Sequence, residues 1–159
     1  MTGVRSILFV CRANMCRSPS AEAVMRAMLH ARAVGVAIEI DSAGTHDFRP
    51  GAPPHVAAAE AGTRRGYDLN GCVARRVMPT DFDRFDMILA MDNANVADLR
   101  RMAPTRCKRK IELLLDYGDR FYGEEIPDPI GEDATHFDRV LEMIEDGCGG
   151  LVQLLVRAA

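Results

Sequence analysis

A short apolar run at residues 6–10 ends at a loop that has Cys11 and Arg17 at its two ends and Ser18-Pro19 directly after it. Almost wholly apolar runs of this length are typical of a central strand of a parallel sheet, buried on both faces. Ser18 followed by Pro19 predicts a helix with Ser18 as its N-cap and Pro19 as its first residue. The chain therefore begins with a strand, a tight loop and a helix, the unit of an α/β protein.

Strands alternate with helices along the rest of the chain. The predicted elements are strands at 36–40, 85–91 and 110–115, helices at 54–65 and 93–102, a long loop at 116–133, and a last helix with a break near Gly149. This alternation predicts a doubly wound α/β fold with a parallel sheet, which binds ligands at the carboxyl ends of its strands. The length predicts a single domain over residues 1–159.

Composition narrows the class of protein. Apolar residues make up 48% of the chain, charged residues 27%, and the net charge is -3, so we expect a soluble domain that does not bind nucleic acid. The run at 7–10 is too short for a signal peptide, and nothing approaches the roughly 18 apolar residues of a membrane span. Five cysteines without regular spacing predict reduced thiols and a cytoplasmic protein, with no metal site and no cofactor.

The loop from Cys11 to Arg17 is suited to binding an anion. Five intervening residues allow backbone N–H groups to point inward at a helix N-terminus, and Asn14 tolerates the left-handed conformation that such a turn needs. The helix end and the guanidinium favour the thiolate of Cys11, while the planar fork of Arg17 can bind two phosphate oxygens. The alternatives are a buried core thiol, a surface arginine and a solvated turn asparagine.

Several motifs occur in one order along the chain: residues 11–19, 41–45, 51–54, 85–92, 99–104 and 127–129. With these motifs the chain resembles the low-molecular-weight protein tyrosine phosphatase family. The resemblance implies a four-stranded, flavodoxin-like parallel sheet of order 2-1-3-4 with helices on both faces. It also implies hydrolysis of phosphotyrosine and small aryl phosphates through a cysteinyl-phosphate intermediate, without a cofactor.

The resemblance assigns three catalytic residues. Cys11 is the nucleophile, Arg17 holds the phosphate, and Asp128 is the general acid that protonates the leaving phenolate and then activates water. Asp128 lies between Pro127 and Pro129, which stiffen its backbone. Taken alone, Asp128 is more readily interpreted as a turn aspartate, so its catalytic role depends on the other motifs.

The remaining predicted site residues surround this centre. Those of the phosphate-binding loop are Arg12, Ala13, Asn14, Met15, Cys16 and Ser18. By resemblance, Ser42 hydrogen-bonds the loop through Asn14, Ser18 donates its hydroxyl to the thiolate, and Cys16 traps oxidised Cys11 as a disulfide. For Ser18 the alternative is a simple N-cap, and for Cys16 a small apolar loop residue.

The chain departs from the family pattern at the mouth of the site. Ile130-Gly131 follows the acid where the family has two aromatic residues, whereas Phe48 keeps one aromatic wall for a substrate ring. Arg12 is predicted to favour acidic sequence around the phosphate, the alternative being a solvent-facing arginine. Ala13 replaces a glycine, and Cys72 lies where relatives often have a histidine that supports Asn14.

Two other functions compete with the phosphatase. A thioredoxin-linked arsenate reductase of the same fold needs two more cysteines after the third strand, where this chain has residues 91–93 without one. A phosphoprotein-binding module is the other, because the aromatic wall is reduced. The expected partners are tyrosine-phosphorylated proteins, including a tyrosine autokinase if the chain is bacterial, and phosphate or other oxyanions in the loop, with no nucleic acid and no membrane.

Overall fold

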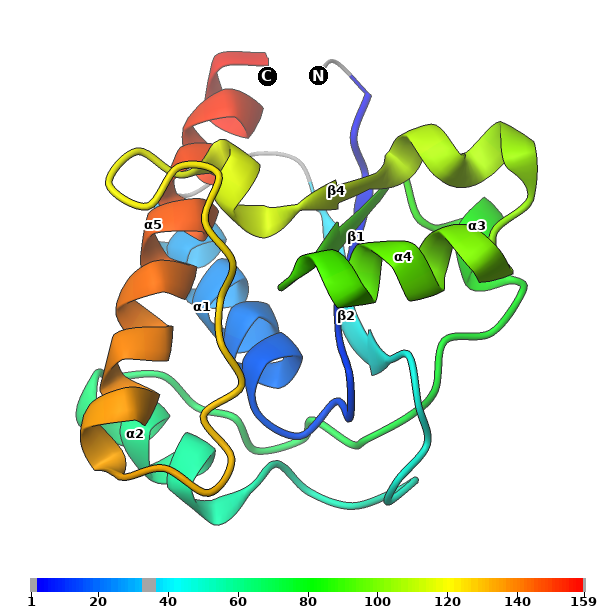
Figure 1. Ribbon diagram of the computed structural model, residues 1–159. Helices are drawn as coiled ribbons and strands as arrows, with labels where there is room; N and C mark the ends of the chain where they lie inside the picture. The colour runs from blue at the N-terminus through cyan, green and yellow to red at the C-terminus, as the bar shows by residue number, and fades with distance from the viewer. Residues whose placement is uncertain (1–2, 33–36, 159) are drawn as a thin grey trace.

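The computed structural model describes residues 3–32 and 37–158, and four strands and their helices follow one another along the chain (Figure 1). The elements are β1 (Ser6–Cys11), α1 (Arg17–Ala31), β2 (Glu39–Gly44), α2 (Val56–Arg64), α3 (Asp81–Arg84), β3 (Met87–Ala90), α4 (Asn93–Met102), the 3₁₀ turn η1 (Thr105–Lys110), β4 (Ile111–Leu113), the 3₁₀ turn η2 (Leu114–Tyr117) and α5 (Ala134–Ala158).

The four strands form one parallel sheet of order β2-β1-β3-β4, as predicted. β1 lies in the middle and pairs with β2 from Ser6↔Glu39 to Cys11↔Gly44, and with β3 on its other side. The strand order reverses at β1, because the chain goes first to β2 and then crosses to β3. The loop after β1 therefore begins at the switch point of the sheet, where this class of fold binds ligands.

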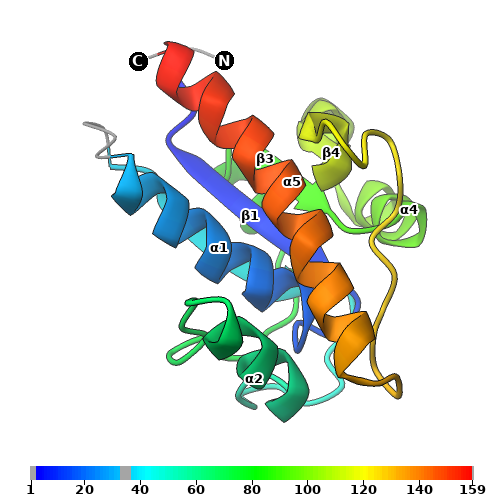
Figure 2. The same ribbon diagram turned by 90° about the vertical axis from the view of Figure 1, so that its left-hand side faces the viewer.

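Alternate residues of β1 enter two separate cores. Ile7 and Phe9 pack with residues of α1 and α5 on one face, whereas Leu8 and Val10 pack with α3 and α4 on the other. Figure 2 shows α1 and α5 lying side by side over the sheet, with α4 behind it. All six residues of β1 are buried, which explains why an unbroken apolar run forms this strand.

The start of α1 differs from the sequence prediction. The helix begins at Arg17, and neither Ser18 nor any other side chain caps it; Ser18 is its second residue. The hydroxyl of Ser18 is instead in contact with the sulfur of Cys11, the amide of Asn14 and the carbonyl of Ala43. The N-cap prediction was wrong because these tertiary partners take the hydroxyl away from the helix end.

The second strand also lies further along the chain than predicted. Residues 37–38 precede it, Val36 lies outside the described residues, and β2 runs from Glu39 to Gly44. Pairing with β1 fixes this register, and small buried residues such as Ala43 replace the expected apolar run. β3 and β4 are shorter than predicted, whereas α4 has the predicted bounds of 93–102.

The last helix is continuous, so the predicted break near Gly149 was wrong. α5 runs over 25 residues with Gly147, Gly149 and Gly150 inside it. A Cβ atom at Gly147 would lie 2.7 Å from the Leu114 side chain, and one at Gly150 would overlap the carbonyl oxygen of Tyr117. The two glycines thus allow η2 to pack directly against the helix, and this packing stabilises the segment that glycine itself weakens.

Candidate active site

The predicted nucleophile and phosphate-holding residue lie at the carboxyl edge of the sheet. Cys11 ends β1 and Arg17 begins α1, and both side chains are buried. The sulfur of Cys11 lies 3.0 Å from the Ser18 hydroxyl, in the first turn of α1. A hydroxyl and a helix N-terminus at this distance both stabilise negative charge on sulfur.

Asn14 holds the loop in its conformation. It is the one non-glycine residue with a positive φ, 56°, in the described part of the chain. Its amide nitrogen donates to the hydroxyls of Ser18 at 2.8 Å and Ser42 at 3.0 Å, and its oxygen accepts from the backbone N–H of Arg75 at 3.0 Å. These three bonds stabilise a left-handed residue that would otherwise cost about 1 kcal/mol.

The floor of the loop is the end of β2. A Cβ atom at Gly44 would lie 2.7 Å from the carbonyl oxygen of Arg12, so only glycine fits there. Just beyond it, the N–H groups of Thr45 and His46 donate to the carbonyls of Cys11 and Arg12, each at 2.9 Å. Ala13 has a negative φ, as its replacement of a glycine requires.

A buried carboxylate that the sequence analysis missed supports Ser42. Glu22 of α1 is 4% exposed, and one of its oxygens accepts a hydrogen bond from the Ser42 hydroxyl at 2.6 Å, while Arg26 pairs with the other. Burial and the nearby Glu22 raise the pKa of the Cys72 thiol to about 12. The only sequence signal for this role is the position of Glu22, an acid beside the apolar residues Ala21 and Met25 on the buried face of α1.

A second missed carboxylate, Asp92, holds Arg17. One Asp92 oxygen accepts from the guanidinium at 2.7 Å, and the other caps α4 by accepting the N–H of Asn95, also at 2.7 Å. The same guanidinium nitrogen donates to the carbonyl of Ile126 at 3.0 Å. Asp92 follows β3, and its place at the carboxyl edge of the sheet was the signal that could have identified it.

Asp128 lies on the solvent side of Arg17. Its carboxylate is 46% exposed and 3.9 Å from the second guanidinium nitrogen, and its other oxygen accepts the N–H of Ile130 at 3.1 Å. The long loop is anchored just before it, where the N–H of Ile126 donates to the carbonyl of Met91 at 2.9 Å. The fold thus brings residues 11, 17 and 128 together.

Cys16 lies inside the same loop and is buried. Its pKa is raised to about 12, first by burial and then by the negative charges of Cys11 and Asp128. Cys16 is therefore a neutral thiol near pH 7. Met15, beside it, is partly buried, and its carbonyl accepts the N–H of His55 at 2.8 Å, which ties the loop to the start of α2.

The rim of the site carries Arg12, His46 and Phe48. The guanidinium carbon of Arg12 lies 5.1 Å from the centre of the Phe48 ring, and the rings of His46 and Phe48 stack at 5.7 Å and 23°. Phe48 is 55% exposed and Ile130 is 47% exposed. The Phe48 ring, predicted to be an aromatic wall of the site, is thus in contact with the Arg12 guanidinium and the His46 ring.

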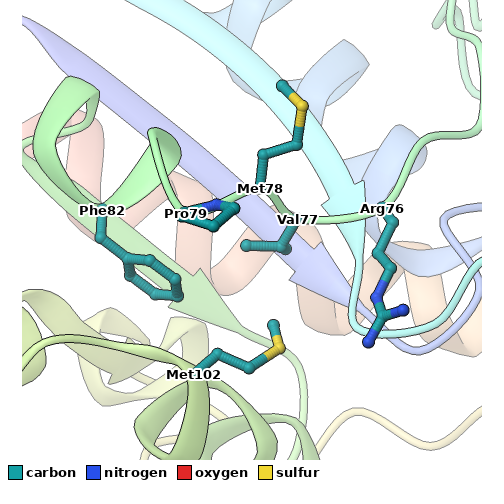
Figure 3. Close-up of a pocket in the computed structure, with 6 residues that line it drawn as sticks. All are labelled: Arg76, Val77, Met78, Pro79, Phe82 and Met102. Atoms are coloured by element: carbon teal, nitrogen blue, oxygen red, sulfur yellow. The ribbon is translucent and has the colours of Figure 1, made fainter.

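A hollow of about 350 Å³ lies away from these residues, against the α3 and α4 face of the sheet. In Figure 3 the side chains of Val77, Phe82 and Met102 converge on it, with Arg76 at one end. None of the predicted site residues lines it.

Among the described residues, no helix is long and apolar enough to cross a membrane, and no cluster of three potential ligands is placed to hold a metal ion.

A four-stranded parallel sheet with a cysteine and an arginine on one loop at its switch point, and an aspartate 3.9 Å from that arginine, is the arrangement of a cysteine-dependent phosphatase. The family model described as low molecular weight phosphotyrosine protein phosphatase matches residues 6–159. The chain therefore belongs to the low-molecular-weight protein tyrosine phosphatase family, as predicted.

Similar proteins agree in sequence and in structure. The low molecular weight protein-tyrosine-phosphatase YfkJ of Bacillus subtilis is 39% identical over 147 residues, which cover 92% of this chain and 93% of that protein. Its crystal structure has a TM-score of 0.89, with 98% and 96% of the two chains covered. A protein tyrosine phosphatase from Entamoeba histolytica, with Hepes in its active site, has a TM-score of 0.91 at 36% identity, covering 95% and 96%.

Proposed function

We propose that this protein tyrosine phosphatase hydrolyses phosphotyrosine and small aryl phosphates with Cys11 as nucleophile, Arg17 as phosphate clamp and Asp128 as general acid and base. One arrangement carries the proposal. The Arg17 guanidinium is held by Asp92 and lies 3.9 Å from the Asp128 carboxylate. Arg17 also begins the helix whose first turn contacts the Cys11 sulfur. A phosphate bound in the loop then meets a nucleophile, a cation and an acid together.

In the first step the Cys11 thiolate forms a bond to phosphorus as the bond from phosphorus to the phenolic oxygen breaks. Asp128 gives its proton to that oxygen, so tyrosine leaves neutral and Asp128 becomes a carboxylate. Arg17 binds two equatorial phosphate oxygens through its planar fork, and its rigid attachment to Asp92 keeps the fork in place as charge develops.

In the second step a water molecule attacks the cysteinyl-phosphate. Asp128 takes a proton from the water, the bond from phosphorus to sulfur breaks, and Cys11 leaves as a thiolate with inorganic phosphate as the product. The Ser18 hydroxyl, 3.0 Å from the sulfur, donates a hydrogen bond to the departing thiolate. Asn14 and Ser42 act by positioning this loop, through their hydrogen bond of 3.0 Å.

Cys16 is proposed to protect the nucleophile. Peroxide converts the Cys11 thiolate to a sulfenic acid with release of hydroxide, and the Cys16 thiol then displaces water to form a disulfide. The negative charge of Cys11 is one of the causes that raise the pKa of Cys16. Oxidation of Cys11 to a sulfenic acid removes this charge, so Cys16 loses its proton more readily when it attacks. Intact mass after mild peroxide, lower by two hydrogens in wild type but not in Cys16→Ser, is the measurement that supports this step.

We also propose a cellular setting for the enzyme. We place one phosphatase domain over residues 1–159 and its activity in the cytoplasm, because the nucleophile must stay reduced and all five cysteines of the structure are free thiols. The substrates are tyrosine-phosphorylated proteins, with a tyrosine autokinase among them if the chain is bacterial. Phosphate and other oxyanions compete for the loop.

The test is release of inorganic phosphate from a phosphotyrosine peptide, in EDTA and reductant, by wild type and by Cys11→Ser and Asp128→Asn. Wild type is expected to be active and Cys11→Ser inactive. Asp128→Asn is expected to lose about 10²-fold or more on phenyl phosphate but less on p-nitrophenyl phosphate, whose leaving group needs little protonation.

Cys107→Ser is the matched control, since Cys107 is a buried thiol of η1 in the other core. It is expected to keep activity. Equal losses for Asp128→Asn on the two phosphates would remove Asp128 from the acid role. A folded wild type that binds the phosphopeptide without releasing phosphate would overturn the enzyme in favour of a binding module.

A further inference from the structure

The residue that follows the nucleophile presents a positive charge at the rim of the site. Arg12 is exposed, and its guanidinium carbon lies 5.1 Å from the centre of the Phe48 ring, within the range of a cation–π contact. Its carbonyl accepts the N–H of His46, whose ring stacks on Phe48. Both ends of Arg12 are thus held by the segment that follows β2, so the charge has a defined place beside Cys11.

The charge of Arg12 is not neutralised by a neighbouring carboxylate. Arg12 takes part in none of the ion pairs between residues of the described part of the chain, although most of the other arginines do. An aromatic face lowers the energy of a cation without cancelling its charge. The guanidinium therefore keeps its fork of N–H donors available for an anion from outside.

The other wall of the mouth has the opposite charge. The loop after Ile126 carries the exposed acidic residues Asp128, Glu132 and Asp133, with the His136 ring 3.8 Å from Glu132 and 2.9 Å from Asp133. Figure 1 shows this loop and the segment at 45–50 on either side of the turn after β1. A peptide over the mouth thus meets a cation on one side and carboxylates on the other, and like charges on the second side are unfavourable.

We propose that Arg12 selects phosphotyrosine that has an aspartate or glutamate next to it on one side of the chain, and that Arg12 binds this carboxylate. The inference rests on the proposed function, because the phosphate in the loop fixes where the neighbouring residues of the substrate lie. The acidic residues of the loop after Ile126 repel an aspartate or glutamate on the other flank of the phosphotyrosine, so the preference is one-sided. Phe48 acts as a positioning residue for Arg12 as well as a wall for the substrate ring.

The test compares kcat/KM for three phosphotyrosine peptides that differ only next to the phosphotyrosine: an acid before it, an acid after it, or neutral residues on both sides. Wild type is expected to prefer one acidic peptide over the neutral one by about threefold to fivefold at low salt, the range of an exposed ion pair. The preference is expected to shrink at about 0.5 M salt, where the Debye length is only a few ångströms.

Two substitutions locate the effect. Arg12→Gln is expected to bring the ratio of acidic to neutral peptide to about one, and Arg12→Glu to reverse it in favour of a peptide with a lysine at that flank. Arg100→Gln, at an exposed arginine of α4, is the matched control and is expected to keep the wild-type ratio.

A further variant separates positioning from simple contact. Phe48→Leu is expected to reduce the ratio, because the guanidinium loses its support, whereas a ring that only touches the substrate would lower kcat/KM equally for all three peptides. A ratio near one in wild type, or a ratio unchanged in Arg12→Gln, overturns the inference while phosphate release continues. No release from any peptide would overturn the proposed function, and this inference with it.

Discussion

Asp92 stabilises two different structures with its two carboxylate oxygens. One oxygen holds the buried guanidinium of Arg17, and the other caps α4 through the N–H of Asn95. The amide of Asn95 completes the cap by accepting the N–H of Asp92 at 3.2 Å. A residue this close in sequence to a helix start is readily explained as a cap alone. Its place after β3 marks it as a candidate site residue, but its contact with Arg17 comes from the structure.

We predict that Asp92→Asn lowers kcat/KM by about tenfold or more while α4 persists. Asparagine keeps an oxygen for the cap, but its neutral amide no longer pairs with Arg17, and a buried arginine without a partner is destabilised and displaced. Steady-state kinetics on p-nitrophenyl phosphate, together with urea unfolding, measure the two effects.

Asn95→Ala is the matched control for this prediction. It removes the side chain that completes the cap without removing the carboxylate on Arg17, and it is expected to cost about 1 kcal/mol of stability with kcat/KM nearly kept. Equal kinetic losses in the two variants would mean that the helix, and not the contact with Arg17, sets the activity.

At the scale of elements, the parts that the sequence predicts well are those determined by neighbouring residues. α4 has its predicted bounds because Asp92 caps it and Pro104 follows it. The N-cap assigned to Ser18 failed because contacts with Cys11 and Asn14 decide where its hydroxyl points. Asp92 and Arg17 are 75 residues apart, and no local pattern predicts such a contact.

Two glycines in α5 provide a prediction on packing. Gly150→Ala is expected to destabilise the protein by about 2 kcal/mol or more, because the new methyl group would overlap the Tyr117 carbonyl and push η2 away. Gly149→Ala is expected to stabilise it by about 0.5–1 kcal/mol, because open space surrounds that position and alanine favours the helix. Urea unfolding of the two variants beside wild type decides, and similar effects at both positions would contradict this account of the continuous helix.

At the scale of the whole molecule, burial changes the acid–base properties of several thiols and phenols. It raises the pKa of Cys16 and of Cys72 to about 12, and it also raises the pKa values of Cys148 and Tyr67. In the unfolded chain a cysteine titrates near pKa 8.5. At a pH between the unfolded and the native pKa values, the native state keeps protons that the unfolded chain has already released.

The protein should therefore lose stability in alkali. Because the unfolded state binds fewer protons than the native state above about pH 9, the free energy of unfolding falls as pH rises towards 12. Urea unfolding in reductant at a series of pH values measures the slope, and Cys72→Ser, which removes one titrating thiol, should make it shallower. A free energy of unfolding that stays level or rises over this range would contradict the burial of these groups.

Because Ile126 is anchored, the length of the surface loop before it does not determine where the catalytic acid Asp128 lies. The Ile126 N–H is bound to the carbonyl of Met91, directly after β3, and its own carbonyl to Arg17, only two residues before Asp128. Insertions or deletions at the exposed residues 122–124, ahead of this anchor, would lengthen or shorten the loop without moving the acid. This segment can therefore vary in length during evolution while the acid keeps its distance from the phosphate.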